Sequence, residues 1–229
     1  MFPRLQHDRE ALPGLLRTIS DYAADVLAQQ AHRPVAQRPA PLDLEPATHA
    51  GRGVETAWTL FRERIAPHLA MSAGPRYFGF VTGGTTPAAF VGDWLTTLFD
   101  QNAVSRLDGA VALDVERTTV QWLADLFGLP AEFAGTFVSG ATMSNVVGLA
   151  IAREWLGRQQ GVDIHRDGLA ALRRPPSILS ATPHSTAVKA LSMLGLGRQG
   201  WQSVGCLPGR EAMDVAALAE RLGTTAGPH

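Results

Sequence analysis

Cysteine and lysine are almost missing from this 229-residue sequence, which contains only Cys206 and Lys189 of these two types. A single cysteine excludes a disulfide within the chain and argues against a zinc site built from cysteines. A reducing cytoplasm is the compartment that fits this usage. The seven histidines are scattered and lack the spacing of metal ligands, so no metal site is expected.

An excess of charge of either sign is also missing, because the formal net charge is -1. The sequence therefore offers no basic footprint for nucleic acid and no acidic tail for a charged partner. The N-terminus, MFPRLQHDRE, is too polar for a signal peptide, and charges or glycines interrupt the apolar stretches before they reach the length of a membrane span. With 45% hydrophobic and 18% charged residues, the composition is that of a soluble globular protein.

The spacing of apolar residues predicts helices that alternate with short strands in the second half of the chain. The expected helices cover 8–31, 54–65, 88–99, 113–127, 140–155, 185–194 and 213–222. The expected strands cover 136–138, 177–180 and 202–206. Four prolines between Pro34 and Pro46 predict a stiff extended connector. Strands that alternate with helices predict an α/β fold with a mainly parallel sheet covered by helices.

The most informative segment is TFVSGATMSNVVGLAIAR, residues 136–153, in which a predicted strand leads through Gly140 into a helix. A helix N-terminus offers unpaired N–H groups and the positive end of the helix dipole, and small residues let a ligand approach the backbone. The pattern therefore suits a phosphate. The alternative is an ordinary helix N-cap supplied by Ser139 or Thr142.

A second segment, SATPHSTAVKA, places His184 between a predicted strand and a predicted helix. An imidazole at this position can stack on a flat ring or transfer protons. Taken alone, a core histidine or a helix-capping histidine is the simpler reading. Lys189 lies five residues further on among Val188, Ala190 and Leu191, and we expect it to be an exposed helix residue.

Together with GPRYFGFVTGG at 74–84, these segments resemble the group II pyridoxal-phosphate (PLP)-dependent amino-acid decarboxylases, the family of aromatic-amino-acid, glutamate and histidine decarboxylases. GPRYFGF is similar to that family's glycine-histidine-proline-aromatic segment, although Gly74 directly precedes Pro75 and the usual histidine is missing. SGATMSN resembles the loop that holds the cofactor phosphate. PHSTAVKA resembles the segment whose histidine stacks on the pyridine ring.

The resemblance implies roles for particular residues. Ala141 and Thr142 would bind the phosphate of PLP, and His184 would be both a cofactor-binding and a catalytic residue. Tyr77, Phe78 and Thr82 would line the substrate pocket. The implied fold is that of the aspartate aminotransferase type (fold type I). An N-terminal helical arm with its connector would cover residues 1–72, and the first part of the large PLP-binding domain would cover 73–229.

The resemblance also implies decarboxylation of an L-amino acid in a cytoplasmic homodimer. The family needs an aspartate for the pyridine nitrogen and a lysine for the Schiff base, and both are expected beyond residue 229, so this chain is expected to be an inactive N-terminal fragment. Two alternatives remain open: another PLP reaction on the same fold, such as that of an aminotransferase or a lyase, and a non-catalytic remnant or interaction protein.

Three other patterns are weaker. GLGRQG at 195–200 has the glycines of a dinucleotide-binding turn, but it follows a helix and precedes a strand, the reverse of the required order. TFVSG at 136–140 lacks the first glycine of a nucleophile elbow. The apolar helix faces that carry Trp94 and Trp122 are expected to be core.

Overall fold

The structure is a computed structural model that describes residues 3–36, 51–104, 107 and 110–224. The chain divides into two compact units, Met1–Leu113 and Asp114–His229, and each is described by itself. The boundary between arm and large domain predicted after residue 72 remains a prediction. The proline connector lies almost wholly outside the described residues.

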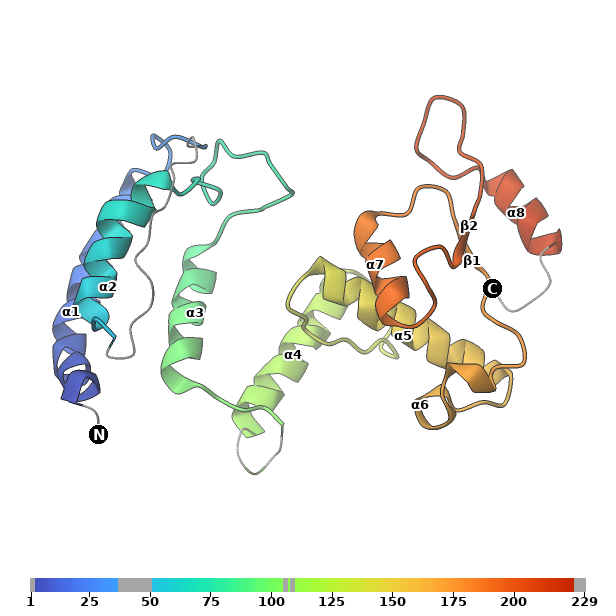
Figure 1. Cartoon of the computed structure of the whole chain (residues 1–229), viewed down its shortest axis with the longest axis horizontal. Coiled ribbons are helices and arrows are strands. Elements are labelled where there is room, and N and C mark those ends of the chain that lie inside the picture. The colour runs from blue at the N-terminus through green and yellow to red at the C-terminus, as the bar shows by residue number, and fades with distance from the viewer. Residues whose placement is uncertain (1–2, 37–50, 105–106, 108–109, 225–229) are drawn as a thin grey trace. The chain divides into compact units, whose positions relative to one another are not determined.

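Unit 1 is helical (Figure 1). Its elements are α1 (Pro3–Ala28), α2 (Val54–Leu60), a π-helical turn (Phe61–Ile65), a 3-10 turn (Ala66–His68) and α3 (Pro87–Phe99). The start of α3 follows from its sequence, because Pro87 suits the first helical turn and Thr86 accepts a hydrogen bond from the N–H of Ala89 at 3.2 Å.

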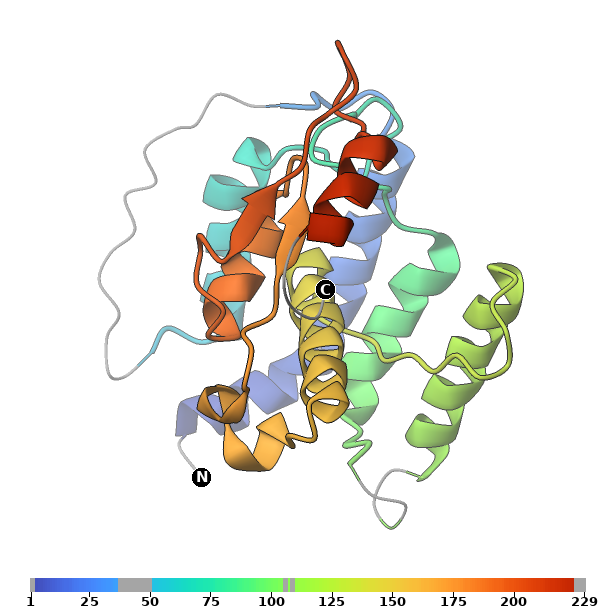
Figure 2. The same ribbon diagram turned by 90° about the vertical axis from the view of Figure 1, so that its right-hand side faces the viewer.

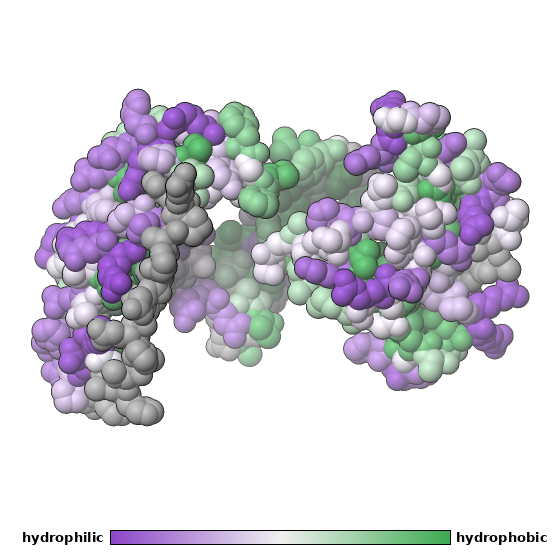
Figure 3. Space-filling model, turned by 45° about the horizontal axis from the view of Figure 1, so that its top comes forward, coloured by the Kyte–Doolittle hydropathy of each residue, from purple (hydrophilic) through white to green (hydrophobic). Residues whose placement is uncertain are grey.

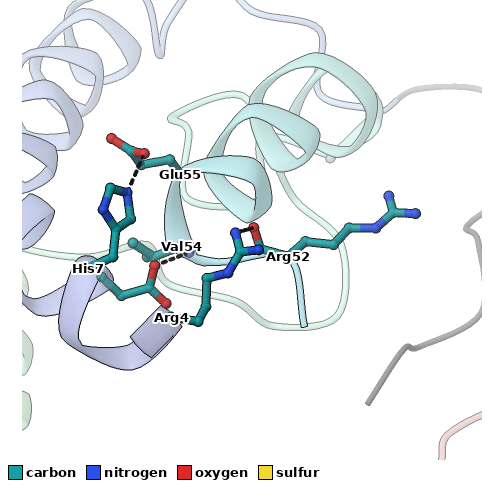
Figure 4. Close-up of polar contacts among 6 residues, drawn as sticks. Arg4, His7, Arg52, Val54 and Glu55 are labelled. Carbon is teal, nitrogen blue, oxygen red and sulfur yellow. Dashed lines mark hydrogen bonds and ion pairs between the residues drawn. The ribbon is translucent and has the colours of Figure 1, made fainter. Parts of the chain in front are cut away.

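The N-terminal ends of α1 and α2 are joined by polar contacts (Figure 4). The carboxylate of Asp8 accepts a hydrogen bond from the N–H of Val54 at 3.1 Å and so satisfies a free donor at the start of α2. Arg4 donates to the carbonyl of Arg52 at 3.0 Å, and His7 lies 3.5 Å from a carboxylate oxygen of Glu55.

Unit 2 combines helices with a small parallel sheet. The boundary between the units falls within α4 (Ala110–Leu126), after its first turn. After α4 come α5 (Ala141–Gln159), α6 (Ile164–Asp167), a 3-10 turn (Leu169–Ala171), β1 (Ile178–Ser180), α7 (Ser185–Met193), β2 (Trp201–Ser203) and α8 (Val215–Thr224). Strands β1 and β2 pair in parallel, with Ile178 opposite Trp201, and Figure 2 shows them side by side. Because α7 connects them, β1, α7 and β2 form a βαβ unit.

The contact between α5 and α7 organises unit 2. Ala190 and Leu191 of α7 are buried, with 0% and 2% of their surface exposed. Arg153 of α5 donates to the carbonyl of Leu194 just after α7, at 3.2 Å. One helical turn further along α5, Gly157 packs so closely on Ile164 of α6 that an added Cβ would lie 2.7 Å from that side chain. Helix α5 thus packs against both α7 and α6.

Most predicted elements are confirmed with small shifts of their ends, including all seven helices and the strands at 178–180 and 201–203. The strand predicted at 136–138 is wrong, because this segment has no regular secondary structure and pairs with no strand among the described residues. GLGRQG ends α7, with Gly195 and Gly197 at positive φ, as a helix stop requires.

The expectation that Trp94 and Trp122 are core residues is also wrong, since 42% and 66% of their surfaces are exposed. Other apolar side chains of α3 and α4 are exposed as well. Figure 3 shows hydrophobic residues, in green, at the molecular surface. Their helices are amphipathic as predicted, but no described element covers these faces. Within the described residues, no helix combines the length and the apolar character needed to cross a membrane.

Candidate functional site

The N-terminus of α5 has no side-chain cap. Its N-cap residue is Gly140, and the first intrahelical hydrogen bond runs from the N–H of Ser144 to the carbonyl of Gly140 at 3.1 Å. The preceding N–H groups, those of Ala141, Thr142 and Met143, are the donors that an α-helix leaves without an intrahelical partner. Neither Ser139 nor Thr142 caps the helix, so the simpler reading of this segment is wrong.

Space is available in front of these donors. A Cβ built on Gly140 would meet no atom within 4 Å, and Ala141 and Thr142 are exposed. The dipole of a 19-residue helix favours negative charge at this end. An uncapped, accessible helix N-terminus of this kind suits a phosphate monoester, which accepts several hydrogen bonds and carries negative charge.

His184 is the N-cap residue of α7. Its Nδ1 accepts a hydrogen bond from the backbone N–H of Thr186 at 3.2 Å and lies 2.8 Å from the hydroxyl oxygen of that residue. The capping role considered from the sequence is therefore confirmed for one nitrogen. The side chain is nevertheless exposed, so a ligand can approach the imidazole.

The structure brings the two segments together within unit 2. Helices α5 and α7 pack against each other, and the side-chain amide of Asn145 in α5 donates to the hydroxyl of Thr186 in α7 at 2.9 Å. Asn145 lies one helical turn after Ala141, so this bond joins the start of α5 to the start of α7. Ala141 and Thr142 therefore belong to the same packed helix pair as His184.

Sequence reasoning missed Asn145 and Thr186. The signal was present, because a hydroxyl residue two positions after His184 can reach back to it at a helix start, as capping side chains do. The partner of that hydroxyl could not be inferred, because Asn145 is 41 residues away in the sequence.

Lys189 lies on the exposed surface of α7, as predicted. It is more than one helical turn beyond His184. The charged groups whose pKa is shifted lie elsewhere, on α6. A hydrogen bond of 2.8 Å from Arg166 lowers the pKa of Asp167, and the same bond raises the pKa of Arg166.

Tyr77, Phe78 and Thr82, the predicted substrate-pocket residues, lie in unit 1, on the loop that precedes α3. Tyr77 is half-buried, and Phe78 is 94% exposed. Thr82 donates from its hydroxyl to the carbonyl of Gly79 at 3.1 Å. Phe80 and Val81 have positive φ angles of 54° and 58°, which is a strained conformation for a bulky and a β-branched residue.

Comparison with known proteins gives the class to which this fold and site belong. The family model "Pyridoxal-dependent decarboxylase conserved domain" matches residues 52–213. The chain therefore belongs to the pyridoxal-dependent decarboxylase family, which confirms the resemblance of its sequence motifs and the cofactor of the family, PLP.

Individual relatives are similar over shorter stretches. The aromatic-L-amino-acid decarboxylase of Bacillus atrophaeus is 35% identical over 80 residues, which cover 35% of this chain and 17% of that protein. The L-2,4-diaminobutyrate decarboxylase of Acinetobacter baumannii is 32% identical over 119 residues, which cover 47% of this chain and 23% of the relative.

Solved structures confirm the α/β fold of the PLP-dependent decarboxylases, fold type I. The TDC of Oryza sativa, solved with PLP and tryptamine, has a TM-score of 0.76 at 22% identity, over 93% of this chain and 48% of that one. The glutamate decarboxylase domain of a protein from Vibrio parahaemolyticus has a TM-score of 0.78 at 22% identity, over 93% and 47%. The chain spans about half the length of these structures.

Proposed function

We propose that this protein acts in the PLP-dependent decarboxylation of an L-amino acid. The observation that supports the proposal most strongly is the uncapped N-terminus of α5. Helix α5 packs against α7, and His184 at the start of α7 has an exposed ring. These features supply an anion site and a flat side chain in a chain of the pyridoxal-dependent decarboxylase family.

In this proposal the residues of unit 2 hold the cofactor. The backbone N–H groups of Ala141 and Thr142, with the Thr142 hydroxyl, donate to the phosphate oxygens of PLP. His184 packs its imidazole against the pyridine ring and so sets the orientation of that ring. When bound, PLP supplies an electron sink for the electron pair that the departing carboxylate leaves behind.

We further propose that the loop before α3 contributes to substrate binding through Tyr77, Phe78 and Thr82. The strained backbone at Phe80 and Val81 supports this assignment, because such conformations gather at functional sites. Two aromatic side chains and a hydroxyl on the same loop offer both apolar surface and a hydrogen-bonding group for an amino-acid side chain.

The whole protein is proposed to be a cytoplasmic homodimer. Apolar side chains on α3 and α4 support association, because exposed apolar faces of this kind are typical of interfaces. The free thiol of Cys206 is consistent with a reducing compartment.

The Schiff-base lysine is proposed to be a residue other than Lys189. Lys189 is exposed in the middle of α7, whereas His184 and the start of α5 lie at the N-terminal end of that helix. Since the chain spans about half of the solved decarboxylases, we propose that residues 1–229 alone bind PLP without decarboxylating an amino acid. The nucleotide sequence around the codon for His229 tests the place of the Schiff-base lysine: an aspartate and a lysine for PLP encoded there would support the proposal.

The experiment for the function itself measures carbon dioxide release. The product of the whole gene is incubated with PLP and a panel of aromatic, acidic and diamino L-amino acids, and both amine and aldehyde are quantified. The aldehyde is included because phenylacetaldehyde synthase of a Rosa hybrid cultivar is 26% identical over 170 residues. Amine formation that requires PLP supports the proposal. Aldehyde as the product, with release of carbon dioxide, shows that decarboxylation is coupled to loss of the amino group. Absence of carbon dioxide release, or turnover without PLP, contradicts the proposal.

A further inference from the structure

A chain of hydrogen bonds reaches His184 from α5. The amide nitrogen of Asn145 lies 2.9 Å from the hydroxyl oxygen of Thr186. That oxygen lies 2.8 Å from Nδ1 of His184, and the backbone N–H of Thr186 donates to the same Nδ1 at 3.2 Å. Asn145 and Thr186 are half-buried, whereas His184 is exposed.

The chemistry of these groups fixes the direction of the chain. An amide NH2 group can only donate, so Thr186 uses a lone pair of its oxygen for Asn145. The one proton of the hydroxyl is then available for Nδ1 of His184. The backbone N–H of Thr186 is also a donor, so Nδ1 receives two hydrogen bonds and must present its lone pair. In the neutral ring, the proton is therefore on Nε2.

We propose that Asn145 and Thr186 are positioning residues that fix the plane and the tautomer of His184. The proposal rests on the proposed role of His184 as the platform for the PLP ring. Rotation of the imidazole about its side-chain bonds would break both hydrogen bonds to Nδ1. The ring is thus held with one plane and with its Nε2–H group on the edge away from Thr186.

The same series of hydrogen bonds connects the two parts of the proposed cofactor site. Asn145 lies one helical turn after Ala141, the first residue of α5, so it moves with the N–H groups proposed to hold the phosphate. Thr186 lies in the first turn of α7, next to the proposed platform for the ring. The bond between Asn145 and Thr186 therefore sets the distance between the phosphate donors and the histidine ring.

A purely structural role for these hydrogen bonds would have different consequences. The cap of α7 depends on the backbone N–H of Thr186, which survives any change of the Thr186 side chain. If the hydroxyl and Asn145 merely hold the helices together, their removal lowers stability but leaves the tautomer of His184 and the geometry of bound PLP unchanged.

The tautomer is measured by nitrogen-15 NMR of the full chain without PLP, at about pH 9, where an ordinary imidazole is neutral. The signals of His184 are assigned by their loss in His184→Ala. We expect Nε2 to carry the proton in the wild-type chain. In Asn145→Asp, the new carboxylate accepts the hydroxyl proton of Thr186, so Nδ1 loses its shorter hydrogen bond and keeps only the longer one from the backbone N–H of Thr186. A population with the proton on Nδ1 should then appear. A wild-type ring protonated mainly on Nδ1, or an unchanged ring in Asn145→Asp, overturns the proposal.

A second measurement records the circular dichroism of bound PLP and its dissociation constant in the whole-gene product. Thr186→Val keeps the shape of the side chain and removes the hydroxyl. We expect it to weaken PLP binding about 2- to 10-fold, the effect of one hydrogen bond, and to change the cofactor signal. Thr186→Ser restores the hydroxyl and should restore both. Thr118→Val is the matched control, because its hydroxyl donates to the carbonyl of Asp114 within α4, at 2.8 Å, and touches neither α5 nor α7 through a hydrogen bond among the described residues.

The two measurements separate this proposal from the proposed function. If the wild-type protein binds no PLP, the proposed function fails, while the NMR experiment still decides whether Asn145 and Thr186 orient the ring. If PLP binds and its signal depends on His184 but is equal in wild type, Thr186→Val and Thr118→Val, the proposed function stands and the positioning role is refuted.

Discussion

Replacing Gly140 with aspartate should stabilise the ligand-free protein and weaken its binding of PLP. The N-cap position of α5 has extended backbone, and a Cβ there meets no atom within 4 Å, so the new side chain fits. Its carboxylate can accept from the N–H groups of Thr142 or Met143, and the N–H group of Thr142 is one of the donors proposed to hold the phosphate.

The magnitudes follow from what the carboxylate does at this helix end. A better N-cap adds a few tenths of a kcal/mol over glycine, and a negative charge near the helix dipole adds about 0.3–1 kcal/mol. We therefore expect the free energy of unfolding to rise by about 0.5–1 kcal/mol. Loss of charge-assisted hydrogen bonds to the phosphate, each contributing about 1.5–3 kcal/mol, should weaken PLP binding about 10- to 100-fold.

Urea denaturation without PLP and a PLP titration measure the two effects. Gly140→Asn is the matched control, since it caps the helix with a neutral side chain of similar size. It should stabilise the protein without repelling the phosphate, and so weaken binding less than Gly140→Asp does. If Gly140→Asp raises stability but leaves the dissociation constant for PLP within about twofold of wild type, the N-terminus of α5 is not the phosphate site.

Three further predictions concern single residues. His184→Ala in the whole-gene product should lower turnover far more than Lys189→Ala, because a misplaced ring costs catalysis more than binding; equal, near-normal kinetics of the two variants would sink the assignment. Thr142→Ala should mainly speed the loss of PLP during dialysis by removing a phosphate contact, and unchanged retention would argue against its role. Leu191→Ala, at a buried side chain of α7 that is 2% exposed, should lower the free energy of unfolding by about 2–5 kcal/mol in denaturant titrations, and a loss below about 1 kcal/mol would show that this side chain is not central to unit 2.

The sequence predicted the helices well because their signals are local. Apolar spacing, Pro87 at the start of α3 and the glycines after α7 each act within a few residues. The segment 136–138 shows where such signals end, since a strand exists only when another strand pairs with it. Trp94 and Trp122 show the same limit, because periodicity identifies an apolar face but not the element that covers it.

The candidate site divides in the same way. Ala141, Thr142 and His184 could be predicted because short segments carry their pattern, and the absence of a side-chain cap on α5 strengthens that reading. The hydrogen bond between Asn145 and Thr186 could not, because it joins residues 41 positions apart through the packing of α5 on α7. Local motifs thus revealed the residues proposed to touch the cofactor, and only the structure revealed those that orient them.

A crystal structure of the protein with bound PLP tests the proposed cofactor site. We expect phosphate oxygens about 2.7–3.0 Å from the backbone nitrogens of Ala141 and Thr142, the spacing of charge-assisted hydrogen bonds. We also expect the imidazole of His184 to lie against the face of the pyridine ring. A phosphate bound away from the start of α5, or a pyridine ring out of contact with His184, would refute the proposed site.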